Sequence, residues 1–159
     1  MAQAEENMRF HEIFHIEGGD FTNAGAISSR VKKILKEAGF PGQIILRTSI
    51  ATFEAEMNVI CYANQGSLSL FIAPNFLKVV VEDEGTGISD VNLAMKEGYS
   101  TADDRVRELG FGAGMGLSNI RRNTDEMVLT SRLGRGTHLE FVISLEGADR
   151  SVPLLSSGG

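Results

Sequence analysis

Between Ala24 and Ala38 the apolar residues recur at helical spacing. The stripe consists of Ile27, Val31, Ile34, Leu35 and Ala38. Apolar residues three and four positions apart lie on one face of a helix, so the pattern predicts an amphipathic helix over 24–38. Thr22 or Asn23 can cap its start, and Gly39 can end it. We expect this helix to pack with its apolar face on another layer.

A second helical pattern runs from Gln43 to Ala63. Its apolar positions are spaced by four, three, four and three residues: Leu46, Ile50, Phe53, Met57 and Ile60. This spacing predicts a helix whose core-facing side is that stripe. We expect the following Asn64-Gln65-Gly66 to end the helix.

Alternating apolar and polar residues predict strands elsewhere in the chain. Leu68, Leu70 and Ile72 alternate before a Pro74-Asn75 turn, and an apolar run over 76–82 follows, which predicts an antiparallel hairpin. We expect further strands over 10–16, 127–131 and 137–145. In the last of these strands one face would hold Thr137, Leu139, Phe141, Ile143 and Leu145. Such an alternation is typical of a half-buried sheet.

The segment from Gly85 to Gly116 is rich in glycine and mostly polar. We expect a short helix over 91–97 and another over 115–124. Loops this long inside a compact domain usually serve a function, so residues 88–113 are a candidate lid.

Together these elements predict one α+β domain over residues 9–146. It would be a two-layer α/β sandwich, in which a mixed, mostly antiparallel sheet carries three main helices on one face. The length of 159 residues and the hydrophobic content of 42% fit a single domain with its own core. Residues 1–8 and 147–159 are expected to be flexible tails.

Composition limits the possible partners and compartments. The net charge of −6 gives no broad cationic surface for nucleic-acid phosphates, so we expect no nucleic-acid partner. Cys61 is the single cysteine, which excludes an internal disulfide and a cysteine-rich metal centre. Residues 1–7 lack the pattern of a secretory signal, and no apolar run approaches the about 20 residues of a membrane span. We therefore expect a cytoplasmic protein that does not bind membranes.

Glu54 and Asn58 stand four residues apart and share one face of the second predicted helix, at the edge of its core stripe. Carboxylate and amide oxygens are suited to Mg²⁺, or to orienting a hydroxyl or a water. A polar helix edge without a binding role is the alternative interpretation.

Asp83 follows an apolar strand and precedes Gly85 and Gly87. It continues one face of that strand, and the glycines let the backbone approach a ligand closely. An aspartate there can accept a hydrogen bond from an exocyclic amine. The alternative is an acidic turn after a strand.

Alternating glycines precede the predicted helix over 115–124, in Gly110-Phe111-Gly112-Ala113-Gly114-Met115-Gly116-Leu117. The free N–H groups at a helix N-terminus attract an anion such as a polyphosphate. The run matches neither Gly-x-Gly-x-x-Gly nor a P-loop. A flexible hinge is the alternative interpretation.

The combination is more specific than its parts. The order of Glu-x-x-x-Asn, Asp-x-Gly-x-Gly-Ile, the glycine run and Gly134-Arg135-Gly136-Thr137 resembles the ATP-binding domain of the gyrase, heat-shock chaperone, histidine kinase and mismatch-repair superfamily. This histidine-kinase-like ATPase (GHKL, or Bergerat-fold) resemblance covers roughly residues 9–146. Within the superfamily, residues 58–63 and 114–122 are most similar to the stand-alone anti-sigma-factor and switch-protein serine kinases.

The resemblance assigns a role to each matching residue. It implies that Glu54 is the general base for a protein serine or threonine hydroxyl and that Asn58 holds Mg²⁺. It implies that Asp83 binds the adenine amino group and that Thr137 completes this contact. The residues implied to shape the base pocket are Gly85, Gly87 and Ile88. Those implied to form the phosphate-facing hinge of the lid are Gly110, Gly112, Gly114, Met115, Gly116 and Leu117.

The chain departs from these families after Asn58, because Cys61 and Tyr62 stand where a lysine or histidine is common. Four arginines are candidates to supply that charge or to be solvated surface residues: Arg105, Arg107, Arg121 and Arg122.

The resemblance implies an ATP- and Mg²⁺-dependent serine/threonine protein kinase that phosphorylates a small regulatory partner protein. The alternative is a binding module in which ATP or ADP controls affinity for a sigma factor or switch protein, with little or no phosphoryl transfer. The sequence leaves homodimer formation open.

Overall fold

The computed structural model describes residues 8–85 and 116–146 of the chain. The expected short helix over 91–97 and the candidate lid over 88–113 lie outside these residues, as do residues 1–7 and 147–159 of the expected tails.

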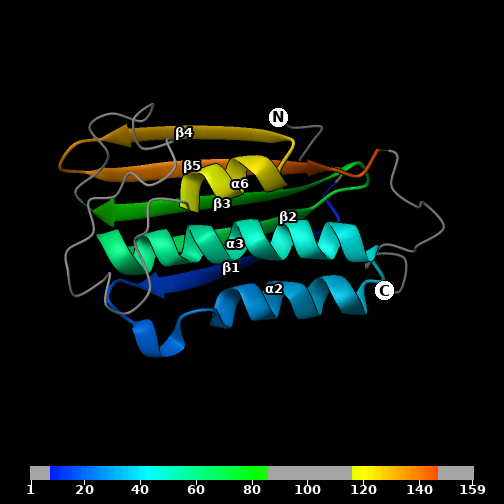
Figure 1. Ribbon diagram of the computed structural model, residues 1–159, viewed down its shortest axis with the longest axis horizontal. Coiled ribbons are helices and arrows are strands. Elements are labelled where there is room, and N and C mark those ends of the chain that lie inside the picture. Colours follow the sequence, from blue (N-terminus) through cyan, green and yellow to red (C-terminus); the bar gives the residue numbers. More distant parts are fainter. Residues whose placement is uncertain (1–7, 86–115, 147–159) are drawn as a thin grey trace.

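Five strands form one sheet in the order β1-β2-β3-β5-β4 (Figure 1). Their bounds are β1 Phe10–Glu17, β2 Ala63–Ile72, β3 Phe76–Gly85, β4 Glu126–Arg132 and β5 Gly136–Ser144. All five strands coincide with predicted strands, although β2 begins at Ala63, before the predicted alternation at Leu68. Every strand pair in the described part of the chain is antiparallel, including the predicted hairpin of β2 and β3.

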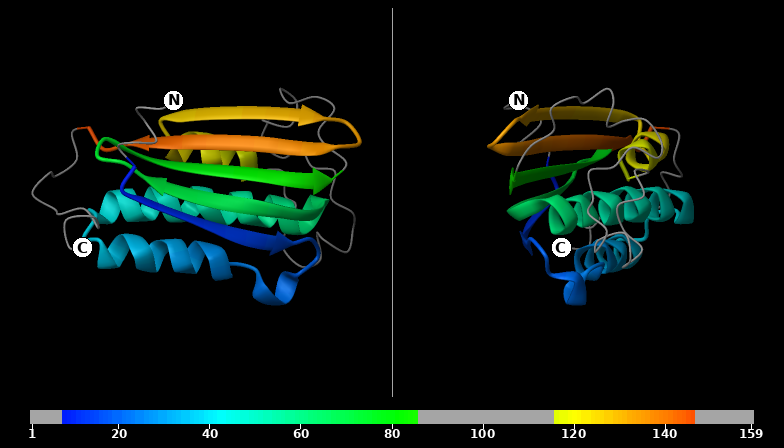
Figure 2. Two further views of the ribbon diagram at one scale, coloured as in Figure 1. Left: turned by 180° about the vertical axis from the view of Figure 1, so that it is seen from behind. Right: turned by 60° about the vertical axis from the view of Figure 1, so that its left-hand side comes forward.

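Three helices pack on this sheet, and Figure 2 shows that all of them lie on the same face. They are α2 (Ala26–Glu37), α3 (Gly42–Tyr62) and α6 (Gly116–Asn123), and a 3₁₀ turn, η1 (Phe21–Asn23), precedes α2. The helix α3 lies between α2 and α6 (Figure 1). The predicted two-layer α+β class is therefore confirmed. In the described residues, no helix has the length and apolar character needed to span a bilayer.

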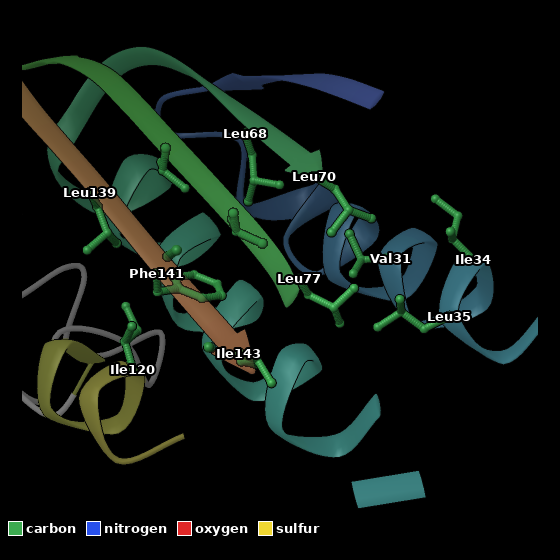
Figure 3. Close-up of a cluster of buried hydrophobic side chains, with 14 of the residues drawn as sticks. Val31, Ile34, Leu35, Leu68, Leu70, Leu77, Ile120, Leu139, Phe141 and Ile143 are labelled. Atoms are coloured by element: carbon green, nitrogen blue, oxygen red, sulfur yellow. The ribbon is translucent and has the colours of Figure 1, made fainter. Parts of the chain in front are cut away.

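The core lies between the sheet and the helices (Figure 3). In β5 the buried residues are the alternating Leu139, Phe141 and Ile143, as predicted. In β3 they are Leu77, Val79 and Val81. Because side chains alternate across a strand, Asp83 and Thr137 continue these two helix-facing rows to the end of the sheet.

The predicted core stripe of α3 is partly wrong. Met57 and Ile60 are buried, but Leu46 is 61% exposed and Phe53 is 36% exposed. The buried face instead includes Ile44, Thr48, Ala51, Thr52, Ala55 and Val59. Small residues occupy it because α3 is packed against α2, α6 and the sheet at once, so a count of large apolar residues misplaces the centre of the buried face.

The start of α2 is stabilised by a residue from another helix. Neither Thr22 nor Asn23 caps it as expected, since both lie in η1. The carboxylate of Glu56, 1% exposed on α3, accepts hydrogen bonds from the N–H groups of Gly25 (3.1 Å), Ile27 (3.3 Å) and Ser28 (3.1 Å). A carboxylate at a helix N-terminus satisfies donors that have no partner within the helix. Gly39, with a φ of +80°, follows the end of α2 and stops the helix as predicted.

Replacing Glu56 with glutamine should lower the free energy of unfolding by about 1–3 kcal/mol, because an amide group would face buried N–H donors with a donor of its own. Urea denaturation measures this loss. Glu37→Gln, on an exposed position of α2, is the matched control. Equal unfolding midpoints for the two variants would contradict this role of Glu56.

The junction of α3 and β2 also differs from expectation. The helix ends at Tyr62 and β2 begins at Ala63, so Asn64-Gln65-Gly66 lies in the strand rather than in a terminating turn. Gly66 is needed there because a Cβ atom would lie 2.7 Å from the carbonyl oxygen of Glu82 on β3.

Candidate functional site

Glu54 and Asn58 project from α3 toward the N-terminus of α6. Both side chains are half-buried. A Cβ atom on Gly116, the first residue of α6, would lie 3.1 Å from Oε2 of Glu54 and 3.3 Å from Oδ1 of Asn58. The two oxygens therefore lie side by side against Gly116, where a side chain would be crowded.

This pair of oxygens fits a hard cation that takes most of its ligands from water and phosphate rather than from the protein. Among the described residues no group of three or more histidine, cysteine, aspartate or glutamate side chains could hold a metal. Mg²⁺ typically takes one or two protein oxygens and completes its shell with water and phosphate oxygens. Glu54 and Asn58 thus suit a metal that arrives with a phosphate.

Asp83 lies at the end of β3, where its Oδ1 accepts a hydrogen bond of 3.1 Å from the backbone N–H of Thr137 on β5. Burial raises the pKa of Asp83 above its ordinary value, and the bond from Thr137 opposes this shift. A carboxylate has about four acceptor positions, so Asp83 can accept a further hydrogen bond from a ligand amine. The structure therefore brings Asp83 and Thr137 together.

Two glycines allow this close arrangement. A side chain on Gly136 would collide with the carbonyl oxygen of Asp83, and its φ of +138° is one that other residues rarely adopt. Gly66 approaches Asp83 from the other neighbouring strand, since its Cβ would lie 3.2 Å from that of Asp83. The sequence analysis missed this role of Gly66, and a glycine within an alternating strand is the signal that could have found it.

The other predicted site residues divide into two groups. Gly85 packs against the backbone of Tyr62 and Ala63 at the junction of α3 and β2, and Leu117 packs against the core. The remaining predicted residues lie outside the described part of the chain: Gly87, Ile88, Gly110, Gly112, Gly114 and Met115.

Of the four candidate arginines, Arg105 and Arg107 also lie outside the described residues. Arg121 is exposed on α6. The guanidinium of Arg122 donates a hydrogen bond of 2.7 Å to Oδ1 of Asn119, whose own Nδ2 lies 3.4 Å from Oε1 of Glu54. The sequence analysis did not single out Asn119. Its position three residues after Gly116, on the same side of the helix, was the available signal.

Cys61 is half-buried and packs against the core. Burial, together with the negative charge of Glu54, raises the pKa of its thiol to about 11. The thiol is therefore neutral near pH 7, so Cys61 adds no negative charge beside Glu54.

The raised pKa predicts that Cys61 reacts slowly with iodoacetamide. At pH 8 its thiolate fraction should be about a hundredfold below that of an ordinary cysteine, because only the thiolate reacts. The alkylation rate, followed by mass spectrometry on the folded protein and again in urea, measures the difference. Equal rates in both conditions would contradict the burial of this thiol.

A groove of about 690 Å³ opens at the same end of the sheet. Asp83, Gly136 and Thr137 line it, but so do residues such as Glu82 and His138, whose side chains alternate onto the face opposite the helices. Neither Glu54 nor Asn58 lines this groove. We therefore define the candidate site by the convergence of side chains on the helix side, and regard the groove as an opening beside Asp83.

Comparison with known proteins identifies relatives of this chain. Residues 31–147 match the family of histidine kinase-, DNA gyrase B-, and HSP90-like ATPases. The serine/threonine-protein kinase RsbT of Bacillus subtilis (strain 168) is 30% identical over 115 residues, which is 70% of this chain and 80% of that protein. The anti-sigma F factor of Caldanaerobacter subterraneus subsp. tengcongensis is 34% identical over 92 residues, and that of Thermoanaerobacter sp. (strain X514) is 32% identical over 92.

The matches to the two anti-sigma F factors each span 55% of this chain and 61% of the relative. The family match, in contrast, runs from the middle of α2 to the end of the described sheet. It thus includes Glu54, Asn58, Asp83 and Thr137. The chain belongs to the family of histidine kinase-, DNA gyrase B-, and HSP90-like ATPases.

Proposed function

We propose that this protein is an ATP- and Mg²⁺-dependent serine/threonine protein kinase of the anti-sigma regulatory type, and that it phosphorylates a small regulatory partner protein. The observation that carries the proposal is that Glu54 Oε2 and Asn58 Oδ1 lie side by side next to Gly116, at the N-terminus of α6. A module that only binds nucleotide needs the contact made by Asp83, but it does not need the carboxylate of Glu54. The relatives named as a serine/threonine kinase and as anti-sigma factors support the same activity and class of partner.

In this proposal Asp83 and Thr137 bind the adenine end of ATP. The Asp83 carboxylate accepts a hydrogen bond from the exocyclic amine, while the Thr137 N–H holds its Oδ1 in place. Asn58 Oδ1 would hold Mg²⁺ at the other end of the nucleotide. Bound Mg²⁺ would neutralise charge on the phosphate oxygens.

Glu54 acts on the phosphate acceptor. Its carboxylate orients the hydroxyl of a serine or threonine on the partner and accepts the hydroxyl proton. The hydroxyl oxygen forms a bond to the γ-phosphorus, and the bond from that phosphorus to the β,γ-bridging oxygen breaks, releasing ADP. Phosphoryl transfer of this kind depends mainly on positioning and charge stabilisation, which the fixed helices α3 and α6 provide.

The test is transfer of label from γ-³²P-ATP in the presence of Mg²⁺ and a lysate fraction from the source organism. We expect a labelled protein that contains phosphoserine or phosphothreonine and that is absent when Glu54→Gln replaces the wild type. If ATP binds and controls capture of a partner but no protein is labelled, the nucleotide-gated binding module is correct instead. If ATP does not bind, both functions are excluded.

A further inference from the structure

We propose that Asn119 is a positioning residue for Glu54, and that Arg122 fixes the orientation of Asn119. The chain of contacts runs from Arg122 Nη2 to Asn119 Oδ1 at 2.7 Å, and from Asn119 Nδ2 to Glu54 Oε1 at 3.4 Å. This inference rests on the proposed function, because it concerns the residue that would accept the hydroxyl proton.

The chemistry of arginine decides which way the Asn119 amide points. A guanidinium has only donors, so the amide atom that faces Arg122 must be the oxygen. The NH₂ group of Asn119 is then directed at Glu54, where it can only donate. The contact is therefore a hydrogen bond from a neutral donor to a carboxylate, and the reversed amide would lose both interactions.

Asn119 itself is held in place by the packing of α6. Ile120 beside it is fully buried in the core. At the far end of α6, Arg47 on α3 donates to the Asn123 carbonyl oxygen at 3.1 Å and to Oδ1 of Asp125 at 3.2 Å. Oδ2 of Asp125 in turn accepts a hydrogen bond of 2.7 Å from the N–H of Ser144 on β5. The helix is thus fixed to both α3 and the sheet.

The two oxygens of Glu54 consequently have different surroundings. Oε1 is held by Asn119, whereas Oε2 faces the space beside Gly116 and Asn58. Fixing one oxygen restricts rotation of the carboxylate and aims the other at the place where the acceptor hydroxyl must lie. A misplacement of about 1 Å at a reacting group can reduce a rate by about a hundredfold.

The kinetic test compares Asn119→Asp with Asn75→Asp, at an exposed position in the turn between β2 and β3. Asn119→Asp keeps an acceptor for Arg122 but replaces the donor that faces Glu54 with an oxygen. We expect kcat for phosphoryl transfer to the labelled acceptor protein to fall by about 10- to 100-fold, with the KM for ATP changed by less than about threefold. Asn75→Asp adds the same charge far from the site and should keep kcat within about threefold of wild type. Equal kcat values for the two variants, or a KM for ATP that rises in proportion to the loss, would overturn the positioning role.

A second measurement does not require activity. The side-chain amide signals of Asn119 in ¹⁵N NMR spectra should move in Glu54→Ala, whereas those of Asn75, in the turn between β2 and β3, should not. Unchanged Asn119 signals would show that the contact is absent and would overturn the inference. If the Asn119 signals respond but the wild type transfers no phosphate to any protein, the proposed function has failed and the positioning role fails with it. If the wild type transfers phosphate and the Asn119 variants behave normally, only this inference is wrong.

Discussion

Replacing Glu54 with glutamine should reduce phosphoryl transfer by about 10²–10⁴-fold, the usual contribution of a positioned general base. Glutamine has nearly the same shape but cannot accept the hydroxyl proton. The hydrogen bond from Asn119 can still be made to the glutamine oxygen, so the packing between α3 and α6 should persist. In this proposal the Glu54 carboxylate acts on the hydroxyl of the partner protein and not on the nucleotide. The affinity for ATP should therefore change by less than about threefold.

Single-turnover transfer with γ-³²P-ATP measures the rate, and calorimetric titration with a nonhydrolysable ATP analogue measures the affinity. Glu37→Gln is the matched control, since it makes the same change at an exposed position on α2. Transfer by Glu54→Gln at the rate of this control would remove Glu54 from the role of base. A parallel loss of ATP affinity would instead assign Glu54 to nucleotide binding.

Asp83→Asn should weaken ATP binding by about a hundredfold. The N–H of Thr137 donates to Oδ1 of Asp83, so the asparagine oxygen would take that place and its NH₂ group would face the ligand. The NH₂ group of the asparagine and the exocyclic amine of adenine would then face each other, and both are hydrogen-bond donors. The loss combines an unmade hydrogen bond to a charged group, worth about 1.5–3 kcal/mol, with an unsatisfied donor.

Calorimetric titration of the variant with ATP measures this loss. Glu84→Gln is the control, because it removes a neighbouring carboxylate whose side chain is exposed and bonded to Gln65.

The titration of Asp83 also predicts that the affinity for ATP depends on pH. Burial raises the pKa of Asp83. Only the ionised carboxylate can accept hydrogen bonds freely at both oxygens, one from Thr137 and one from the ligand.

Affinity for ATP should therefore be complete above that raised pKa and should fall as the pH decreases through it, at a higher pH than an ordinary aspartate with a pKa of about 3.9 would give. In Asp83→Asn this pH dependence should disappear. Identical affinities for the variant and the wild type at pH 7 would contradict the assignment of Asp83 to the adenine.

The sequence predicted the architecture because most of the sheet follows local alternation. The buried residues of β5 and the hairpin of β2 and β3 could be read directly from period-two patterns. The same alternation predicted that Asp83 lies on the face of β3 that carries the apolar residues, and there the N–H of Thr137 contacts it. Helix periodicity located α2 and α3 to within a few residues.

The errors and omissions arise from contacts between elements. The cap of α2 comes from Glu56, about thirty positions along the chain, so no local rule for capping residues could find it. The buried face of α3 contains alanine and threonine because three neighbours surround the helix. The contact between Asn119 and Glu54 joins two helices separated by the candidate lid, and only the packing of α6 on α3 reveals it.

The central claim is that one ATP molecule extends from Asp83 to the space between Glu54, Asn58 and Gly116. A crystal structure of the protein with Mg²⁺ and a nonhydrolysable ATP analogue tests it most directly. We predict the adenine amine within hydrogen-bonding distance of Asp83, Mg²⁺ bound to Oδ1 of Asn58, and the γ-phosphate beside Glu54. An adenine bound away from Asp83, in the groove on the open face of the sheet, or phosphates remote from Asn58 would contradict the account.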